Sequence, residues 1–128
     1  MIGPIAPLFI VEDVRTSMEY YTTHLGFETR LLIPEEDPFF AIVGRDGVEI
    51  LLKHVAEDVA ALPNPSRHEW ARWDAFVHAD EPDELAAEFR QRGAVFREPL
   101  KDHDDGLRGF AVSDADGYVL FFGRPVAG

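Results

Sequence analysis

Apolar and polar positions follow one pattern in the first half of the chain. A strand-like run at Ile5–Val11 leads into a helical stretch at Val14–Leu25, whose apolar residues recur at steps of three and four. Three further strand-like runs follow at about 27–33, 38–43 and 48–53. The pattern therefore predicts a strand, a helix and three more strands, which is a βαβββ module.

The second half repeats this order about 70 residues later. A strand-like run at Arg72–Ala79 precedes a helical stretch at Glu81–Arg92, and three short apolar runs follow, at about 94–98, 107–113 and 118–122. Neither half is expected to fold alone, because a single helix covers only one face of a four-stranded sheet. The sequence thus predicts an α+β fold made of two tandem modules.

Matching end signals support the repeat. Asp13 and Asp80 precede the two helical stretches and are predicted N-caps, while Gly26 and Gly93 follow them as predicted C-terminal glycines. An Asp-Gly pair also precedes the last strand-like run of each half, which is typical of a tight hairpin turn. The two halves therefore share their turns as well as their apolar pattern.

Residues 55–71 separate the modules. They contain Pro63-Asn64-Pro65 and predict a surface linker with one short helix at Ala56–Leu62. We therefore expect a first module at 1–54 and a second at 72–128, together forming one compact domain.

Composition narrows the possible partners. The 128 residues carry a net charge of −12 and no cysteine. The charge argues against nucleic acid as a partner, and it favours cationic ligands or simply solubility. The apolar runs are too short to cross a bilayer, and no secretion signal is evident, so we expect a cytoplasmic protein without membrane contact.

Two motifs carry a family resemblance. The segment from Val11 to Phe27 resembles the opening motif of the glyoxalase/vicinal-oxygen-chelate superfamily, and Gly106–Gly117 resembles its closing motif, with Ala115 in place of the usual proline. The resemblance is closest to the bleomycin-resistance branch, whose members bind a drug without transforming it. It implies a curled mixed sheet around a central cup, a small-molecule ligand and commonly a homodimer.

The same resemblance implies four metal positions in the metal-dependent members. Counted from the motifs, they are Ala6, Leu51, Asp74 and Phe121. Three of these side chains have no donor atom, and one carboxylate cannot hold a catalytic metal. We therefore expect no metal site and no cofactor, and no catalytic residue is identified.

The candidate ligand-binding residues come from the predicted cup lining and from the aromatic side chains. Alternation places Phe76 and His78 on the same strand face as Asp74, which could instead pair with Arg108, and Glu49 shares its face with Leu51. The loop Asp102–Asp105 is either a rim for a cation or a solvated loop. The candidates are Phe40, Glu49, Leu51, Trp70, Asp74, Phe76, Arg108, Phe110 and Phe121.

Three functions remain open at this point. The first is a metal-free protein that sequesters a cationic or aromatic small molecule such as an antibiotic. The second is a lyase, isomerase or dioxygenase of the same superfamily with a divergent site, in which Asp74 or Glu49 could act as a base. The third is a scaffold whose cup is filled by its own side chains.

Overall fold

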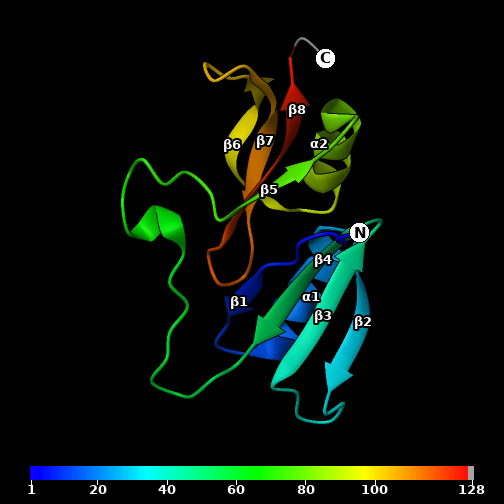
Figure 1. Cartoon of the computed structure of the whole chain (residues 1–128), viewed down its shortest axis with the longest axis vertical. Helices are drawn as coiled ribbons and strands as arrows, with labels where there is room; N and C mark the ends of the chain where they lie inside the picture. The colour runs from blue at the N-terminus through cyan, green and yellow to red at the C-terminus, as the bar shows by residue number, and fades with distance from the viewer. Residues whose placement is uncertain (127–128) are drawn as a thin grey trace. The chain divides into compact units, whose positions relative to one another are not determined.

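The computed structural model describes residues 1–126 and divides the chain into two compact units. One unit ends at Leu62 and the other begins at Pro63, and each contains one α-helix and one four-stranded sheet (Figure 1). The two predicted βαβββ modules are confirmed. The central cup, which requires the modules to be placed against each other, stays a prediction.

The first unit has the strand order β1-β4-β3-β2. β1 pairs with β4 in parallel, and the other neighbours are antiparallel. Its elements are β1 (Leu8–Ile10), α1 (Val14–His24), β2 (Glu28–Ile33), β3 (Phe40–Arg45) and β4 (Val48–Lys53).

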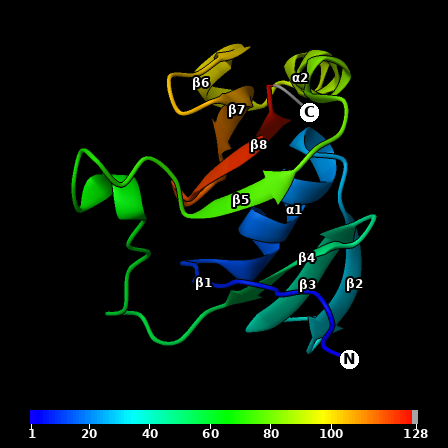
Figure 2. The same cartoon turned by 45° about the horizontal axis from the view of Figure 1, so that its top comes forward.

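The second unit repeats this topology with the order β5-β8-β7-β6, in which β5 and β8 are parallel. Figure 2 shows α2 beside its own sheet, as α1 lies beside the first. The elements are a 3-10 helix (Asn64–Ser66), β5 (Ala75–His78), α2 (Pro82–Gln91), β6 (Val95–Asp102), β7 (Leu107–Ser113) and β8 (Val119–Pro125).

The first helix begins and ends as predicted. The side chain of Asp13 accepts a hydrogen bond from the backbone N–H of Thr16 at 3.1 Å, and Gly26 follows the helix with a φ of 68°. Its buried residues include Val14, Ser17 and Tyr21, whereas Met18, which was expected in the apolar stripe, is only half-buried.

The second helix begins one residue later than predicted. Its N-cap is Glu81 and not Asp80, and the side chain of Asp80 contacts His78 instead. Pro82 explains the shift, because its fixed φ and missing N–H suit the first position of a helix. Gly93 follows the helix with a φ of 80°, as expected.

The predicted linker helix at Ala56–Leu62 is wrong. These residues form no helix, and the short 3-10 helix lies beyond them, at Asn64–Ser66. Seven residues are too few for a stable helix without packing partners, and Pro63 disfavours helical backbone at Leu62.

The strand predictions are right in number and order but differ in extent. The run at 107–113 matches β7, whereas β1 and β5 are shorter than predicted and β6 and β8 are longer. Among residues 1–126, no helix is both long and apolar enough to cross a membrane.

Candidate functional site

Each sheet has one face that packs against its helix and a second face, which we call the open face. In the second unit, Phe89 of α2 contacts the rings of Phe110 and Phe122 at 5.7 and 5.2 Å. Because side chains alternate along a strand, Phe121 lies on the opposite, open face.

An aromatic cluster occupies this open face. It consists of Trp73, Phe76 and Phe121. The ring of Phe121 stacks on Trp73 at 5.3 Å and on Phe76 at 5.7 Å. Phe121 is fully buried, but Phe76 is 42% exposed, so the cluster presents one open aromatic surface.

Two glycines make room for the central ring. A Cβ atom at either Gly109 or Gly123 would lie 2.7 Å from ring carbon Cε1 of Phe121. These two residues face each other across β7 and β8. The absence of side chains there lets the Phe121 ring lie directly on the sheet backbone.

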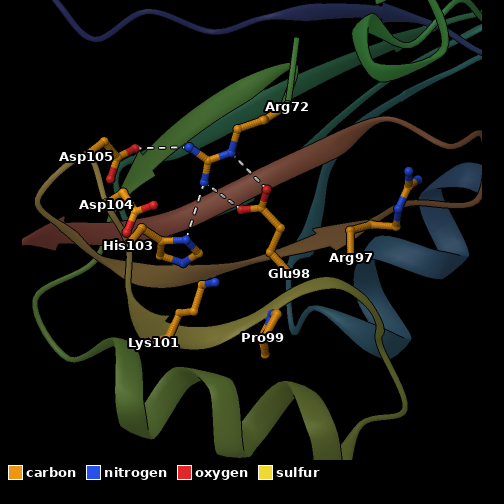
Figure 3. Close-up of a pocket in the computed structure, with 8 residues that line it drawn as sticks. All are labelled: Arg72, Arg97, Glu98, Pro99, Lys101, His103, Asp104 and Asp105. Carbon is orange, nitrogen blue, oxygen red and sulfur yellow. Dashed lines mark hydrogen bonds and ion pairs between the residues drawn. The ribbon is translucent and has the colours of Figure 1, made fainter. Parts of the chain in front are cut away.

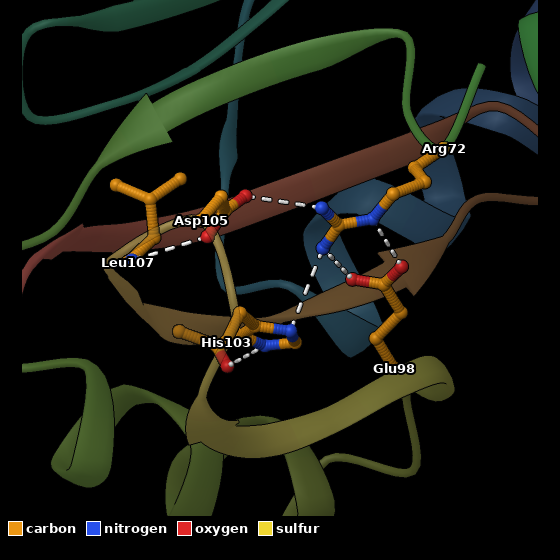
Figure 4. A network of polar contacts seen from close by, with 6 residues as sticks. Arg72, Glu98, His103, Asp105 and Leu107 are labelled. Carbon is orange, nitrogen blue, oxygen red and sulfur yellow. Dashed lines mark hydrogen bonds and ion pairs between the residues drawn. The ribbon is translucent and has the colours of Figure 1, made fainter. Parts of the chain in front are cut away.

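Arg72 lies against two rings of the cluster. Two carboxylates hold its guanidinium group (Figure 4). Its Nε and Nη2 donate hydrogen bonds to Glu98 at 2.9 and 2.8 Å, and its Nη1 donates to Asp105 at 3.0 Å. The guanidinium carbon also lies 5.8 Å from the Trp73 ring centre and 5.9 Å from that of Phe121, within cation–π range.

His103 completes this network. Its Nε2 lies 3.0 Å from the carbonyl oxygen of Gly109, and its Nδ1 lies 3.5 Å from Nη2 of Arg72. A carbonyl can only accept and a guanidinium can only donate, so the neutral ring with the proton on Nε2 satisfies both contacts. The imidazole also contacts the Phe121 ring edge-on at 5.3 Å.

These contacts set the charge states of the network. The hydrogen bonds from Arg72 lower the pKa of Glu98, and those to Glu98 raise the pKa of Arg72. The pKa of Asp105 is also lowered: desolvation opposes the shift, but hydrogen bonds from the backbone N–H of Leu107 and from Arg72 outweigh it. All three groups are therefore charged at neutral pH.

A pocket of about 410 Å³ opens beside the network (Figure 3). Three basic and three acidic side chains line it, so it carries no excess charge despite the acidity of the chain. The lining residues are Arg72, Arg97, Glu98, Pro99, Lys101, His103, Asp104 and Asp105.

The structure brings Phe76 and Phe121 together, as expected of two cup-lining candidates. Asp74, in contrast, binds backbone groups. The two carboxylate oxygens of Asp74 accept hydrogen bonds from the backbone N–H groups of Asn64, at 2.7 Å, and Val119, at 2.8 Å. The proposed pairing of Asp74 with Arg108 is therefore wrong. Asp74 fixes the start of β8 to the linker.

Three other candidates lie away from the aromatic cluster. Arg108 binds Asp83 of α2 through two hydrogen bonds of 2.9 Å, and Phe110 is fully buried against α2, so both belong to the helix-covered face. Trp70 is 84% exposed in the linker and contacts His68.

The remaining candidates lie in the first unit. Leu51 pairs with Leu8 of β1 and is half-buried, and Phe40 pairs with Lys53 of β4. Glu49 accepts a hydrogen bond from Arg30 at 3.2 Å and lines a pocket of about 300 Å³.

The family resemblance assigns four positions to a metal ion, and their side chains do not fit one here. Ala6 has no donor atom. Phe121 is buried under aromatic rings, Leu51 is aliphatic, and both oxygens of Asp74 are already bound by backbone amides. No group of three or more His, Asp or Glu side chains within residues 1–126 is arranged to hold a metal.

Sequence reasoning did not identify Arg72 or Glu98. It left open whether the loop around His103 forms a rim for a cation or is only solvated. The partners of Arg72 are 26 and 33 residues away along the chain, so no local spacing indicated the network. The nearest signal was the position of Arg72 directly before an aromatic residue, at the start of the predicted strand Arg72–Ala79.

Comparison with protein families gives one match over nearly the whole chain. A model of the Glyoxalase/Bleomycin resistance protein/Dioxygenase superfamily matches residues 2–122. The comparison with curated proteins gives no significant match.

Solved structures with the same fold come from several bacteria. TioX from Micromonospora sp. ML1 is 19% identical with a TM-score of 0.74, and the alignment covers 97% of this chain and 99% of TioX. TnmS3, an antibiotic binding protein from Streptomyces sp. CB03234, is 19% identical with a TM-score of 0.65 and 98% coverage of both chains. A glyoxalase-related enzyme from Clostridium phytofermentans is 12% identical with a TM-score of 0.74, covering 98% of this chain and 97% of its own.

Proposed function

The chain belongs to the Glyoxalase/Bleomycin resistance protein/Dioxygenase superfamily, and from this premise we propose that it captures a planar aromatic small molecule without a metal ion. The proposed binding surface is the aromatic cluster together with the adjoining pocket. An antibiotic is the ligand class that we favour, because TnmS3, which shares the fold, is an antibiotic binding protein.

The exposed ring of Phe76 carries this proposal. A large apolar side chain that is 42% exposed and already stacked on a buried ring offers a flat surface for another ring. Polar and charged groups beside a small apolar surface are typical of ligand sites, because they orient what the rings attract.

The electrostatics allow a cationic ligand but do not require one. The pocket itself has balanced charges, so the net charge of −12 would act only through the field of the whole molecule. Aromatic faces attract cations at short range, which gives a positively charged aromatic molecule two sources of attraction.

A thermal-shift screen tests the proposal. Purified protein is heated with a panel of planar aromatic antibiotics, bleomycin included, and with divalent metal ions. A ligand that binds only the folded state raises the melting temperature, so at least one aromatic compound should do so. The Phe76→Ala variant should respond less to that compound. The proposal fails if metals alone stabilise the protein.

The proposal that no metal takes part rests on the missing donor atoms at Leu51 and Phe121. Elemental analysis of the purified protein should find no divalent metal in stoichiometric amount. Near-stoichiometric nickel, zinc, iron or manganese would contradict this and would favour the alternative of a superfamily enzyme.

We further propose that the protein is a cytoplasmic homodimer. Each described sheet ends in edge strands, whose unpaired backbone groups can pair with a second copy of the chain in a symmetric dimer. Sedimentation should therefore give about twice the chain mass of 14.4 kDa. A monomer mass at micromolar concentration, or absence from the soluble cell fraction, would count against this.

A further inference from the structure

A guanidinium group already occupies the polar end of the aromatic cluster. The Arg72 guanidinium lies over two aromatic rings, and its N–H groups bind two carboxylates and one imidazole nitrogen. This combination of π faces and anionic acceptors is the environment in which a planar cation is bound most strongly.

We propose that Arg72 holds the place of a ligand cation, and that the captured molecule binds by exchanging its own planar cationic group, a guanidinium or amidinium, for that of Arg72. This inference rests on the proposed function, because it names the chemical group through which the captured molecule would bind. It also makes Arg72 a residue that keeps the site closed until such a cation arrives.

Exchange of one cation for another avoids a large electrostatic cost. Glu98 is 24% exposed at its side chain, and removing Arg72 without replacement would leave this carboxylate partly buried and unpaired. A ligand cation restores the pair. Arg72 itself is 35% exposed and lines the pocket, so its side chain can leave toward solvent as the ligand enters from the pocket.

Arg108 provides a matched comparison within the same sheet. It donates two hydrogen bonds of 2.9 Å to Asp83 and one of 3.0 Å to Asp102, nearly the geometry of Arg72. Its carboxylate partners are 57% and 58% exposed, and it is not among the residues that line the pocket beside Arg72. Carboxylate pairing is thus common to both arginines, whereas the low exposure of the partner Glu98 and the adjoining pocket distinguish Arg72.

Chemical rescue tests the exchange. Arg72→Ala and Arg108→Ala are each heated with about 10 mM methylguanidinium chloride, with sodium chloride at equal ionic strength, and with N-methylurea, which has a similar shape but no charge. Methylguanidinium should raise the melting temperature of Arg72→Ala by about 2–4 °C. Wild type and Arg108→Ala should change by less than about 1 °C, because their cation sites are occupied or solvated.

A second measurement uses phenylguanidinium, a planar aromatic cation. Calorimetry should show that Arg72→Ala binds it at least about tenfold more tightly than wild type does, since no resident cation competes. If Arg72→Ala does not fold, Arg72→Gln replaces it in both experiments.

The inference is overturned if methylguanidinium stabilises Arg72→Ala no more than Arg108→Ala, if N-methylurea acts equally well, or if phenylguanidinium binds wild type and variant alike. An aromatic compound that still binds wild type in a Phe76-dependent manner would leave the proposed function standing while this inference falls. If no aromatic compound binds but methylguanidinium still stabilises Arg72→Ala, the cation site stands and the proposed capture of an aromatic molecule falls.

Discussion

The two modules share one scaffold but differ in what covers their open faces. Leu51 of β4 and Phe121 of β8 hold equivalent positions, since each lies beside the parallel first strand of its module, opposite Leu8 and Phe76. In the first module the pair is aliphatic and half-exposed. In the second it is a stacked aromatic pair with a buried member.

An arginine lies over each open face, but the two arginines lie over different groups. Arg30 lies over Gly44 and binds Glu28, Glu49 and the carbonyl oxygen of Asp46. Arg72 lies over aromatic rings instead. The C-terminal glycines of the helices and the Asp-Gly hairpin turns are common to both halves, whereas the helix N-caps and the open faces differ. The residues that differ between the halves are therefore where ligand chemistry is to be sought.

The largest expected effect separates the two equivalent positions. Phe121→Ala should lower the free energy of unfolding by about 3–5 kcal/mol, because it leaves a cavity over Gly109 and Gly123. Leu51→Ala should cost only about 1–2 kcal/mol, since part of that side chain is already in water. Urea unfolding at 25 °C measures both. Equal losses would contradict the difference drawn between the modules.

The next effect concerns Asp74, for which the equivalent position in the first module is Ala6. Asp74→Asn replaces one accepting oxygen by a donor, so the backbone N–H of Asn64 or Val119 loses its partner. We expect a loss of about 1–3 kcal/mol in the free energy of unfolding and little change in ligand affinity. Asp80→Asn, at an exposed carboxylate, is the control. A weakened ligand with unchanged stability would instead make Asp74 part of the binding site.

Glu98 makes the stability of the protein depend on pH, and the Glu98→Gln variant isolates this dependence. Its folded pKa lies below the ordinary value of 4.5, so its contribution to stability is present above that value and is lost as the pH falls through the folded pKa. At pH 7, Glu98→Gln should be less stable than wild type by about 1–2 kcal/mol. The gap should close in acid, where both side chains are neutral. A gap that stays constant from neutral to acidic pH would argue that the charge of Glu98 is irrelevant.

The smallest effect compares one aromatic ring from the open face of each module, the exposed Phe76 and the half-buried Phe40. Phe76→Ala should weaken an aromatic ligand by about 0.5–1.5 kcal/mol, or roughly 2- to 10-fold. Phe40→Ala, in the first module, should leave the affinity unchanged. Calorimetric titration of both variants checks this, and an equal weakening would place the ligand on both open faces.

Much of the scaffold could be predicted because its signals are local. Asp13 and Gly26 lie at the ends of a periodic apolar stretch, and the Asp-Gly turns precede short apolar runs, so a few residues determine each feature. The predicted N-cap at Asp80 was wrong because Pro82, two residues further along, determines where the helix begins.

The site was less accessible to sequence reasoning because its faces and partners are not local. β7 and β8 are apolar on both faces, so alternation could not tell that Phe110 faces α2 while Phe121 faces away. The ion pairs of Arg72 join residues from a linker, a strand and a loop, which only the folded chain brings together.

The most direct test of the account asks whether a captured ligand touches the aromatic cluster of the second module. Trp70→Phe removes the exposed indole and leaves Trp73 as the remaining tryptophan. Titration of this variant with an aromatic compound that raises its melting temperature should change the Trp73 fluorescence saturably, with the same dissociation constant that calorimetry gives. Calorimetric binding that leaves the Trp73 emission unchanged would place the ligand elsewhere and contradict the account.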